Sequence, residues 1–149
     1  MILLDANILV YAHAEDSPFH DAAQQLRDRA AQGVFSACLI PQVLCEFYSV
    51  ITDDRQVRPV LRSAQAKREM HHYWNASGFH RILPKDTTMA RLVTLLDRHP
   101  LKRRGIFDAF LVATMLDNDV RTIYTHNVKD FEVYPELQVI NPLAAASPH

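Results

Sequence analysis

Cysteine is scarce in this sequence, which contains only Cys38 and Cys45 among its 149 residues. Their spacing matches neither a CxxC motif nor a cysteine–histidine pattern, which argues against a structural zinc site and against a disulfide framework. A chain without such a framework is typical of a reducing cytosol, so we expect a cytoplasmic protein. We expect both cysteines to lie in the core rather than to act as nucleophiles.

An excess of charge of one sign is also missing. The 16 Lys and Arg residues and the 17 Asp and Glu residues leave a formal net charge of −1. A polycationic nucleic-acid binder is therefore excluded, and binding of RNA or DNA requires a local basic patch. No apolar run approaches the roughly 18 residues that a membrane helix needs. The short run at residues 1–4 follows no basic segment, so we expect neither a membrane span nor a signal peptide.

Repeats, low-complexity segments and internal linkers are absent as well. The length suits one domain, and the hydrophobic fraction of 48% supports a packed core. We predict a single domain over residues 1–142, followed by a flexible C-terminal tail over residues 143–149.

What is present is an alternation of short apolar runs with longer helical patterns. The runs predict strands at residues 2–4, 34–38, 79–83, 121–124 and 139–140. The helical patterns cover residues 6–12, 17–33, 41–53, 63–75, 88–99 and 106–116, with Ser17-Pro18 as a start signal and Gly33 as a stop signal. Alternating strands and helices predict an α/β fold of three layers, α/β/α, with a central parallel sheet. In such sheets, functional sites form at the carboxyl ends of the strands.

Two aspartates stand out against this pattern. Asp5 directly follows the first strand and is surrounded by apolar residues, although it also suits the N-cap of the next helix. Asp108 is the only charged residue in the apolar segment IFDAFLVATML, and its place in a first turn also suits the helix dipole. Each position therefore has both a structural and a functional interpretation.

Two further acids complete a candidate cluster. Glu46 lies at the border of the apolar face of its helix, where a solvated side chain is the ordinary interpretation, and Asp130 follows the fourth strand. Two carboxylates ~4 Å apart repel each other by about 4 kcal/mol at an effective dielectric constant near 20. A cluster of three or four requires a cation, and oxygen ligands favour Mg²⁺ or Mn²⁺.

Four segments around these acids resemble the signature blocks of PIN-domain nucleases, in the family's order and at its intervals: LDANILVYA, VLCEFYSVI, IFDAFLVATM and THNVKDF. The resemblance covers nearly the whole chain and implies a PIN-like fold that cuts RNA with Mg²⁺ or Mn²⁺. It matches Asp5, Glu46 and Asp108 to catalytic acids. In the last block the family has an acid or Asn at the position of Asn127 and an aspartate three residues later, so either Asn127 or Asp130 fills the fourth position.

A metal held by these acids suggests how the site works. A metal-activated water hydrolyses the phosphodiester, with Asp5 and Asp108 as direct metal ligands and with Glu46 and Asp130 holding metal-bound waters. Supporting roles are expected for three polar residues near the cluster, in orienting a carboxylate, a water or the scissile phosphate: Asn7, Thr125 and Asn127.

The basic run Lys102, Arg103 and Arg104 lies just before Asp108 and is the candidate grip on the RNA backbone. A solvated surface explains these three residues about as well.

Small single-domain bacterial members of the family are mostly toxins of VapBC-type toxin–antitoxin pairs. The resemblance therefore implies a toxin with an RNA substrate, a cognate antitoxin that covers the acidic pocket, and a homodimer.

Three alternative functions share parts of this pattern. A haloacid-dehalogenase phosphatase needs a second aspartate where Asn7 stands, and a phosphorelay receiver needs an aspartate at the end of a mid-chain strand. The serious alternative is a PIN-like domain that binds RNA or protein without cleaving, which Asn127 makes conceivable because an amide carries no negative charge.

Overall fold

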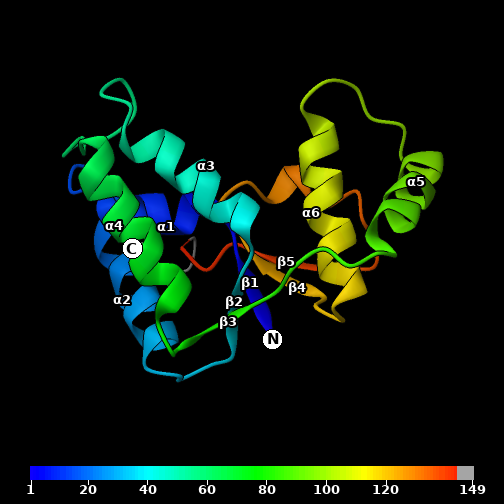
Figure 1. The fold of residues 1–149 in the computed structure, drawn as a ribbon, viewed down its shortest axis with the longest axis horizontal. Helices are drawn as coiled ribbons and strands as arrows, with labels where there is room; N and C mark the ends of the chain where they lie inside the picture. Colours follow the sequence, from blue (N-terminus) through cyan, green and yellow to red (C-terminus); the bar gives the residue numbers. More distant parts are fainter. Residues whose placement is uncertain (144–149) are drawn as a thin grey trace, which may run out of the picture.

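The computed structural model describes residues 1–143, and its centre is a five-stranded sheet (Figure 1). All neighbouring strands run parallel, in the order β3-β2-β1-β4-β5. The strands are short and span β1 Ile2–Leu4, β2 Ala37–Leu39, β3 Phe79–Arg81, β4 Thr122–Tyr124 and β5 Gln138–Ile140.

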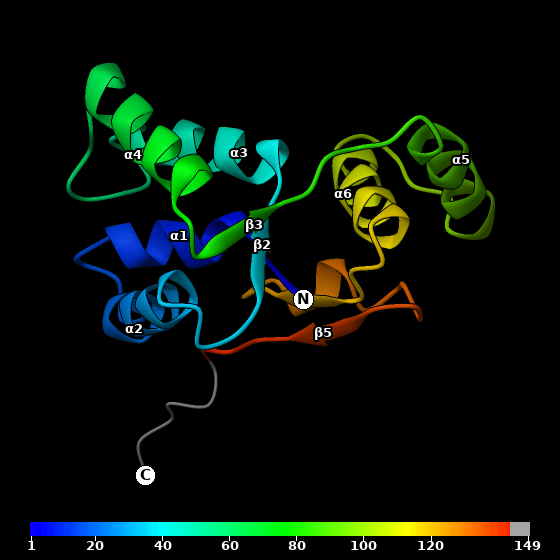
Figure 2. The same cartoon turned by 60° about the horizontal axis from the view of Figure 1, so that its bottom comes forward.

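Helices cover both faces of this sheet, and α1 to α4 lie on the opposite side from α5 and α6 (Figures 1 and 2). The six α-helices within residues 1–143 are α1 Ala6–His13, α2 His20–Ala31, α3 Pro41–Ile51, α4 Ser63–Asn75, α5 Thr88–Arg98 and α6 Gly105–Asp117, and a 3₁₀-helix, η1, spans Val128–Asp130. The predicted three-layer α/β fold is therefore confirmed.

The strand order places a topological switch between β1 and β4. Connections from β1 through β2 to β3 proceed toward one edge, whereas β4 and β5 extend the sheet from the other side of β1. Leu4, the last residue of β1, pairs with Tyr124, the last residue of β4. The residues that follow them, Asp5 and Thr125, therefore emerge side by side at the carboxyl edge, where ligands bind in open α/β sheets.

Helix α6 is the most buried helix in the described part of the chain. Its buried residues fill every side of the helix and are Ala109, Leu111, Val112, Ala113, Thr114, Met115 and Leu116. This agrees with the apolar composition of the segment, which lacks a polar face. Only the first turn, with Asp108, reaches the carboxyl edge of the sheet.

Asp117, at the other end of α6, holds α5 in place. Its carboxylate accepts hydrogen bonds from the hydroxyls of Thr87 at 2.7 Å and Thr88 at 2.8 Å, and it forms an ion pair of 2.6 Å with Arg91. These partners lower the pKa of Asp117 to about 2. This carboxylate therefore has structural partners of its own, unlike Asp108 in the first turn of α6.

Several predicted element boundaries are wrong at one end. The third strand ends at Arg81 rather than at residue 83, and α3 ends at Ile51 rather than at residue 53. The second strand begins at Ala37 rather than at residue 34, because the Val34 amide donates to the Arg29 carbonyl at the end of α2. Gly33 stops that helix as predicted, with φ at 75°. Regular helix α2 begins at His20, after a turn in which the Ser17 hydroxyl accepts from the Phe19 amide.

The end of the described chain bears on the predicted tail. Leu143, its first residue, is 3% exposed and packs with the residues of a small cluster beside α1 and α2. The rest of the predicted tail, residues 144–149, lies outside the described residues. No helix within residues 1–143 is long and apolar enough to cross a membrane.

Candidate active site

One cavity of about 490 Å³ receives all four acids that the sequence singles out. Asp5 enters it from the end of β1, Glu46 from α3, Asp108 from the first turn of α6 and Asp130 from η1. Helices α3 and α6 face each other across the carboxyl end of the sheet at this point (Figure 1). The fold thus gathers side chains that are up to 125 residues apart in sequence.

Asp5 is the most deeply placed of these acids, with 7% of its surface exposed. Its Oδ1 accepts a hydrogen bond of 2.8 Å from the Ala6 amide, so the side chain does cap α1. Its Oδ2 accepts hydrogen bonds from the Thr125 hydroxyl at 2.8 Å and from the side-chain amide of Asn7 at 3.3 Å. A carboxylate oxygen has two lone pairs, so Oδ1 keeps one for another partner. The helix cap and the site residue are the same carboxylate.

Thr125 and Asn7 form a rigid support behind Asp5. Thr125 is fully buried, and its hydroxyl accepts hydrogen bonds from the Asn7 side chain at 3.1 Å and from the Asn127 amide at 3.0 Å. The Asn7 Oδ1 accepts from the His126 amide at 3.0 Å. The buried Thr125 hydroxyl therefore contacts the Asp5 carboxylate directly and links it to Asn7 and Asn127.

Burial and neighbouring carboxylates raise the pKa of three acids of the cavity, Asp5, Glu46 and Asp108. Burial, followed by the charges of Asp130 and Asp5, raises the pKa of Asp108 to about 6. Burial is also the main cause of the raised pKa of Asp5 and of Glu46, and the nearby Arg104 opposes the rise at Glu46. Such shifts mark acids that are held together at a cost, which a bound cation would offset.

The donor set fits a hard divalent cation. All the acidic donors are carboxylate oxygens, as Mg²⁺ and Mn²⁺ prefer, and Oδ1 of Asp5 has a lone pair to offer. Within residues 1–143, however, no three His, Cys, Asp or Glu side chains converge tightly enough to enclose a metal ion by themselves. Mg²⁺ sites in proteins commonly use only one or two carboxylates and keep several waters.

The segment THNVKDF, the last of the four segments that resemble the PIN-domain signature blocks, contributes both candidate residues for the fourth position to the cavity. Both Asn127 and Asp130 line it, so the amide does not replace the acid. The amide of Asp130 donates to the Asn127 carbonyl at 3.1 Å, which places both residues on one turn.

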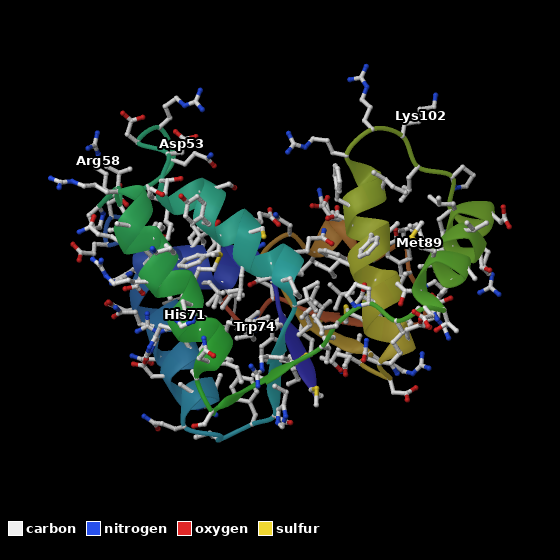
Figure 3. The ribbon with its side chains drawn as sticks, viewed as in Figure 1. Asp53, Arg58, His71, Trp74, Met89 and Lys102 are labelled. Atoms are coloured by element: carbon white, nitrogen blue, oxygen red, sulfur yellow. The ribbon has the colours of Figure 1, made fainter. Side chains whose placement is uncertain are left out.

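The three basic residues before α6, Lys102, Arg103 and Arg104, differ in their position relative to the cavity. Arg104 lines it, whereas Lys102 and Arg103 are exposed and are not among its lining residues. Lys102 points outward from the loop between α5 and α6 (Figure 3). Of the three predicted RNA-binding residues, Arg104 alone lies beside the acids.

Several lining residues were not predicted from the sequence, namely Gln42, Cys45, Ser49, Phe107 and Phe131. Gln42 and Ser49 stand four residues before and three residues after Glu46, so helical spacing was the signal that placed them on its face. The expected core position of Cys45 is wrong: the side chain is exposed, although Cys38 is buried as expected.

A second, larger cavity of about 620 Å³ lies beside the first, between α3 and α4. It is lined by Pro41, Leu44, Cys45, Lys67, Arg68, Met70, His71 and Trp74, of which His71 and Trp74 are labelled in Figure 3. Within residues 1–143 no carboxylate lines it, so the chemistry expected of this chain belongs to the smaller, acidic cavity.

Replacing Thr125 with valine tests the support behind Asp5. The change keeps the shape of the side chain but removes the hydroxyl that donates to Asp5 and accepts from Asn7 and Asn127. We expect RNA cleavage, the activity that the resemblance to PIN-domain nucleases implies, or metal affinity to fall about 10- to 100-fold, as for other partners that orient a metal ligand. Thr125→Ser, which restores the hydroxyl, should recover most of the loss. If valine and serine behave alike, the hydroxyl does not position Asp5.

Known proteins resemble this chain over nearly its full length. The PIN domain family matches residues 2–137. Ribonuclease VapC24 of Mycobacterium tuberculosis is 27% identical over 146 residues, which are 97% of this chain and 99% of that protein. Ribonuclease VapC48 of the same organism is 25% identical over 142 residues, which are 94% of this chain and 96% of that protein.

Solved structures share the fold at lower identity. VapC20 of Mycobacterium tuberculosis, described as a sarcin–ricin loop cleaving toxin, superposes with a TM-score of 0.65 at 15% identity over 87% of this chain and 92% of that chain. The VapBC2 complex of Rickettsia felis, solved with a DNA fragment from its promoter, contains a chain with a TM-score of 0.65 at 19% identity over 94% of this chain and 98% of that chain.

Proposed function

The chain belongs to the PIN-domain family, and on that premise we propose that it is a metal-dependent endoribonuclease that acts as the toxin of a VapBC-type pair. One observation carries the proposal: four carboxylates line a single cavity at the carboxyl edge of the sheet. Relatives named as ribonucleases extend over 97% and 94% of this chain, which supports RNA as the substrate.

We propose that Asp5 and Asp108 hold Mg²⁺ or Mn²⁺ directly and that Glu46 and Asp130 hold the ion's waters. A divalent ion, when bound, lowers the pKa of water and neutralises charge on the phosphoryl oxygens. The protein's part is positional. Thr125 and Asn7 fix the carboxylate plane of Asp5 through two hydrogen bonds, so that its free lone pair faces a constant direction.

Arg104 is the one Lys or Arg side chain of the described residues that lines the cavity. Its charge favours the ionised form of Glu46, since it opposes the rise in that pKa. We propose that it also holds a phosphate of the RNA near the acids, as a charge-assisted hydrogen-bond donor. Lys102 and Arg103 then serve as outer contacts to the RNA backbone, whose contribution falls as salt rises.

The test is cleavage of RNA by the purified chain. Incubation with total cellular RNA and Mg²⁺ or Mn²⁺ should give discrete products, and EDTA should stop their formation. A preparation of Asp5→Asn protein, purified in parallel, controls for contaminating nucleases. RNA that stays intact with either metal would contradict the proposed activity.

The toxin role has a cellular test of its own. Several structural neighbours are toxin–antitoxin complexes, including one from Klebsiella pneumoniae with a TM-score of 0.61. We propose that this chain likewise pairs with an antitoxin, forms a homodimer and works in the cytoplasm. Expression of the chain alone should arrest growth, and co-expression of an antitoxin encoded beside it should restore growth. Unaffected growth would argue against the toxin role but would not bear on the proposed nuclease activity.

The non-cleaving alternative has less support. It rested on the absence of charge at Asn127, but Asp130 brings a carboxylate to the same cavity. The charge of Asp130 also contributes to the raised pKa of both Asp5 and Asp108. The fourth negative charge therefore belongs to the cluster, and a cation site is favoured over an inert pocket.

A further inference from the structure

One aromatic side chain in the described chain is exposed, and it lies at the acidic cavity. Phe107 has 59% of its surface exposed, whereas every other Phe, Tyr and Trp within residues 1–143 is buried or half-buried. It lines the same cavity as the four acids and directly precedes Asp108 in the first turn of α6. Single exposed apolar side chains are common on protein surfaces, so what distinguishes Phe107 is its place beside the four acids.

The turn that carries Phe107 is fixed from the opposite side of the cavity. Gln42 on α3 donates a hydrogen bond of 2.9 Å from its side-chain amide to the Phe107 carbonyl. The bond joins the first turn of α6 to the helix that carries Glu46. The ring is therefore presented by a held backbone rather than by a loose loop.

Because the cavity is strongly acidic, an uncharged part of RNA can bind there more easily than a phosphate can. The cavity is lined by four carboxylates and one guanidinium, so it repels the phosphates of RNA unless a cation is bound. A nucleobase carries no charge, and stacking on an aromatic ring does not depend on neutralising the acids. A ring beside the acids is thus suited to gain binding free energy from RNA where phosphate contacts are weak.

We propose that Phe107 is a stacking platform for the nucleobase beside the scissile phosphate. The inference rests on the proposed nuclease function and deepens it, because it names the kind of RNA that the site accepts. A base can lie flat on a side chain only when it is free of its own duplex stack, so the substrate has an unpaired nucleotide at the cleavage position. Every base has a π-face, so Phe107 supplies affinity rather than sequence specificity.

Cleavage kinetics provide the first test. On a single-stranded RNA that spans a mapped cleavage position, Phe107→Ala and Phe107→Leu should each raise KM by about 5- to 150-fold, the range expected for the loss of one base–aromatic stack. Phe107→Trp should keep the wild-type KM. Leucine is the matched control, because it keeps an apolar side chain and removes only the π-face.

An abasic substrate makes the test specific to stacking. Removing the base beside the scissile phosphate should raise KM for the wild type as much as Phe107→Ala does, and should raise it no further in the Phe107→Ala protein. Equal penalties in both proteins would overturn the proposal. So would a Phe107→Ala protein that cleaves like the wild type but fails to bind its antitoxin, since the ring would then contact protein.

A binding measurement separates this inference from the nuclease proposal. Fluorescein-labelled oligoadenylate is titrated with Asp5→Asn protein and with the Asp5→Asn/Phe107→Ala double variant, and its anisotropy is followed. Binding that is weaker by about 5-fold or more without the ring supports the platform, even if the wild type proves unable to cleave RNA. Equal binding by the two proteins overturns the platform, even if the wild type is an active nuclease.

Discussion

Asp5→Asn and Asp108→Asn should each lower kcat/KM for RNA cleavage by more than about 100-fold. Loss of a residue that merely orients a metal ligand costs about 10- to 100-fold, and the ligand itself should cost more. The amide is nearly isosteric with the carboxylate, so packing is kept while the charge that attracts the cation is lost. The fold should survive, because asparagine at position 5 still caps a helix.

The matched control for these variants is Asp97→Asn, which makes the same chemical change at an exposed position on α5, outside the cavity. It should cleave RNA at the wild-type rate. Circular dichroism and the melting midpoint establish that each variant is folded. Wild-type activity in both cavity variants would refute the assigned roles.

Mn²⁺ should raise the melting midpoint of the wild type by several degrees. A ligand that binds only the folded state stabilises it by mass action, by about 2.7 kcal/mol at a concentration ~100 times its Kd. For a domain of this size, each kcal/mol moves the midpoint by roughly 2–4 °C. The measurement is thermal unfolding with and without Mn²⁺ at constant ionic strength. Asp108→Asn should blunt the gain, and an unchanged wild-type midpoint would speak for a cavity that binds no metal.

Without metal, the stability of the protein should depend on pH through the raised pKa of Asp108. The pKa of Asp108 is about 6 in the folded chain, above its ordinary value of 3.8, so between these values the folded state holds the proton more tightly than the unfolded state does. The free energy of unfolding therefore falls as the pH rises from about 4 to 6. Because Asp108 is partly exposed, we expect a loss of about 1–2 kcal/mol, and Asp108→Asn should remove that part of the pH dependence.

The sequence was sufficient to predict which residues meet at the carboxyl edge, because that requires only the order of strands and helices. Asp5 follows a strand directly, and Asp108 is the single charge in an apolar helix, so both positions are visible as exceptions to a hydrophobic pattern. A parallel sheet sends the end of every strand to the same edge, which brings such exceptions together. Exact register is not needed for that prediction.

Contacts that depend on register were not visible in the sequence. The hydroxyl of Thr125 reaches Asp5 because Leu4 pairs with Tyr124, and two residues 120 positions apart carry no local signal of that pairing. The exposure of Phe107 was equally hidden, since an apolar segment predicts a buried helix at every position. Cys45 was misplaced for a similar reason, because α3 turns that side of its surface toward two cavities.

On the proposed function, the acidic cavity holds a divalent cation between Asp5 and Asp108. The most direct measurement is the anomalous scattering of Mn²⁺ in crystals of the wild type grown with that ion. We predict one anomalous peak at the carboxyl edge of the sheet, in contact with a carboxylate oxygen of Asp5 and one of Asp108, and its loss in crystals of Asp108→Asn. A map with no peak in this cavity, or with the ion bound only elsewhere on the protein, would contradict the claim.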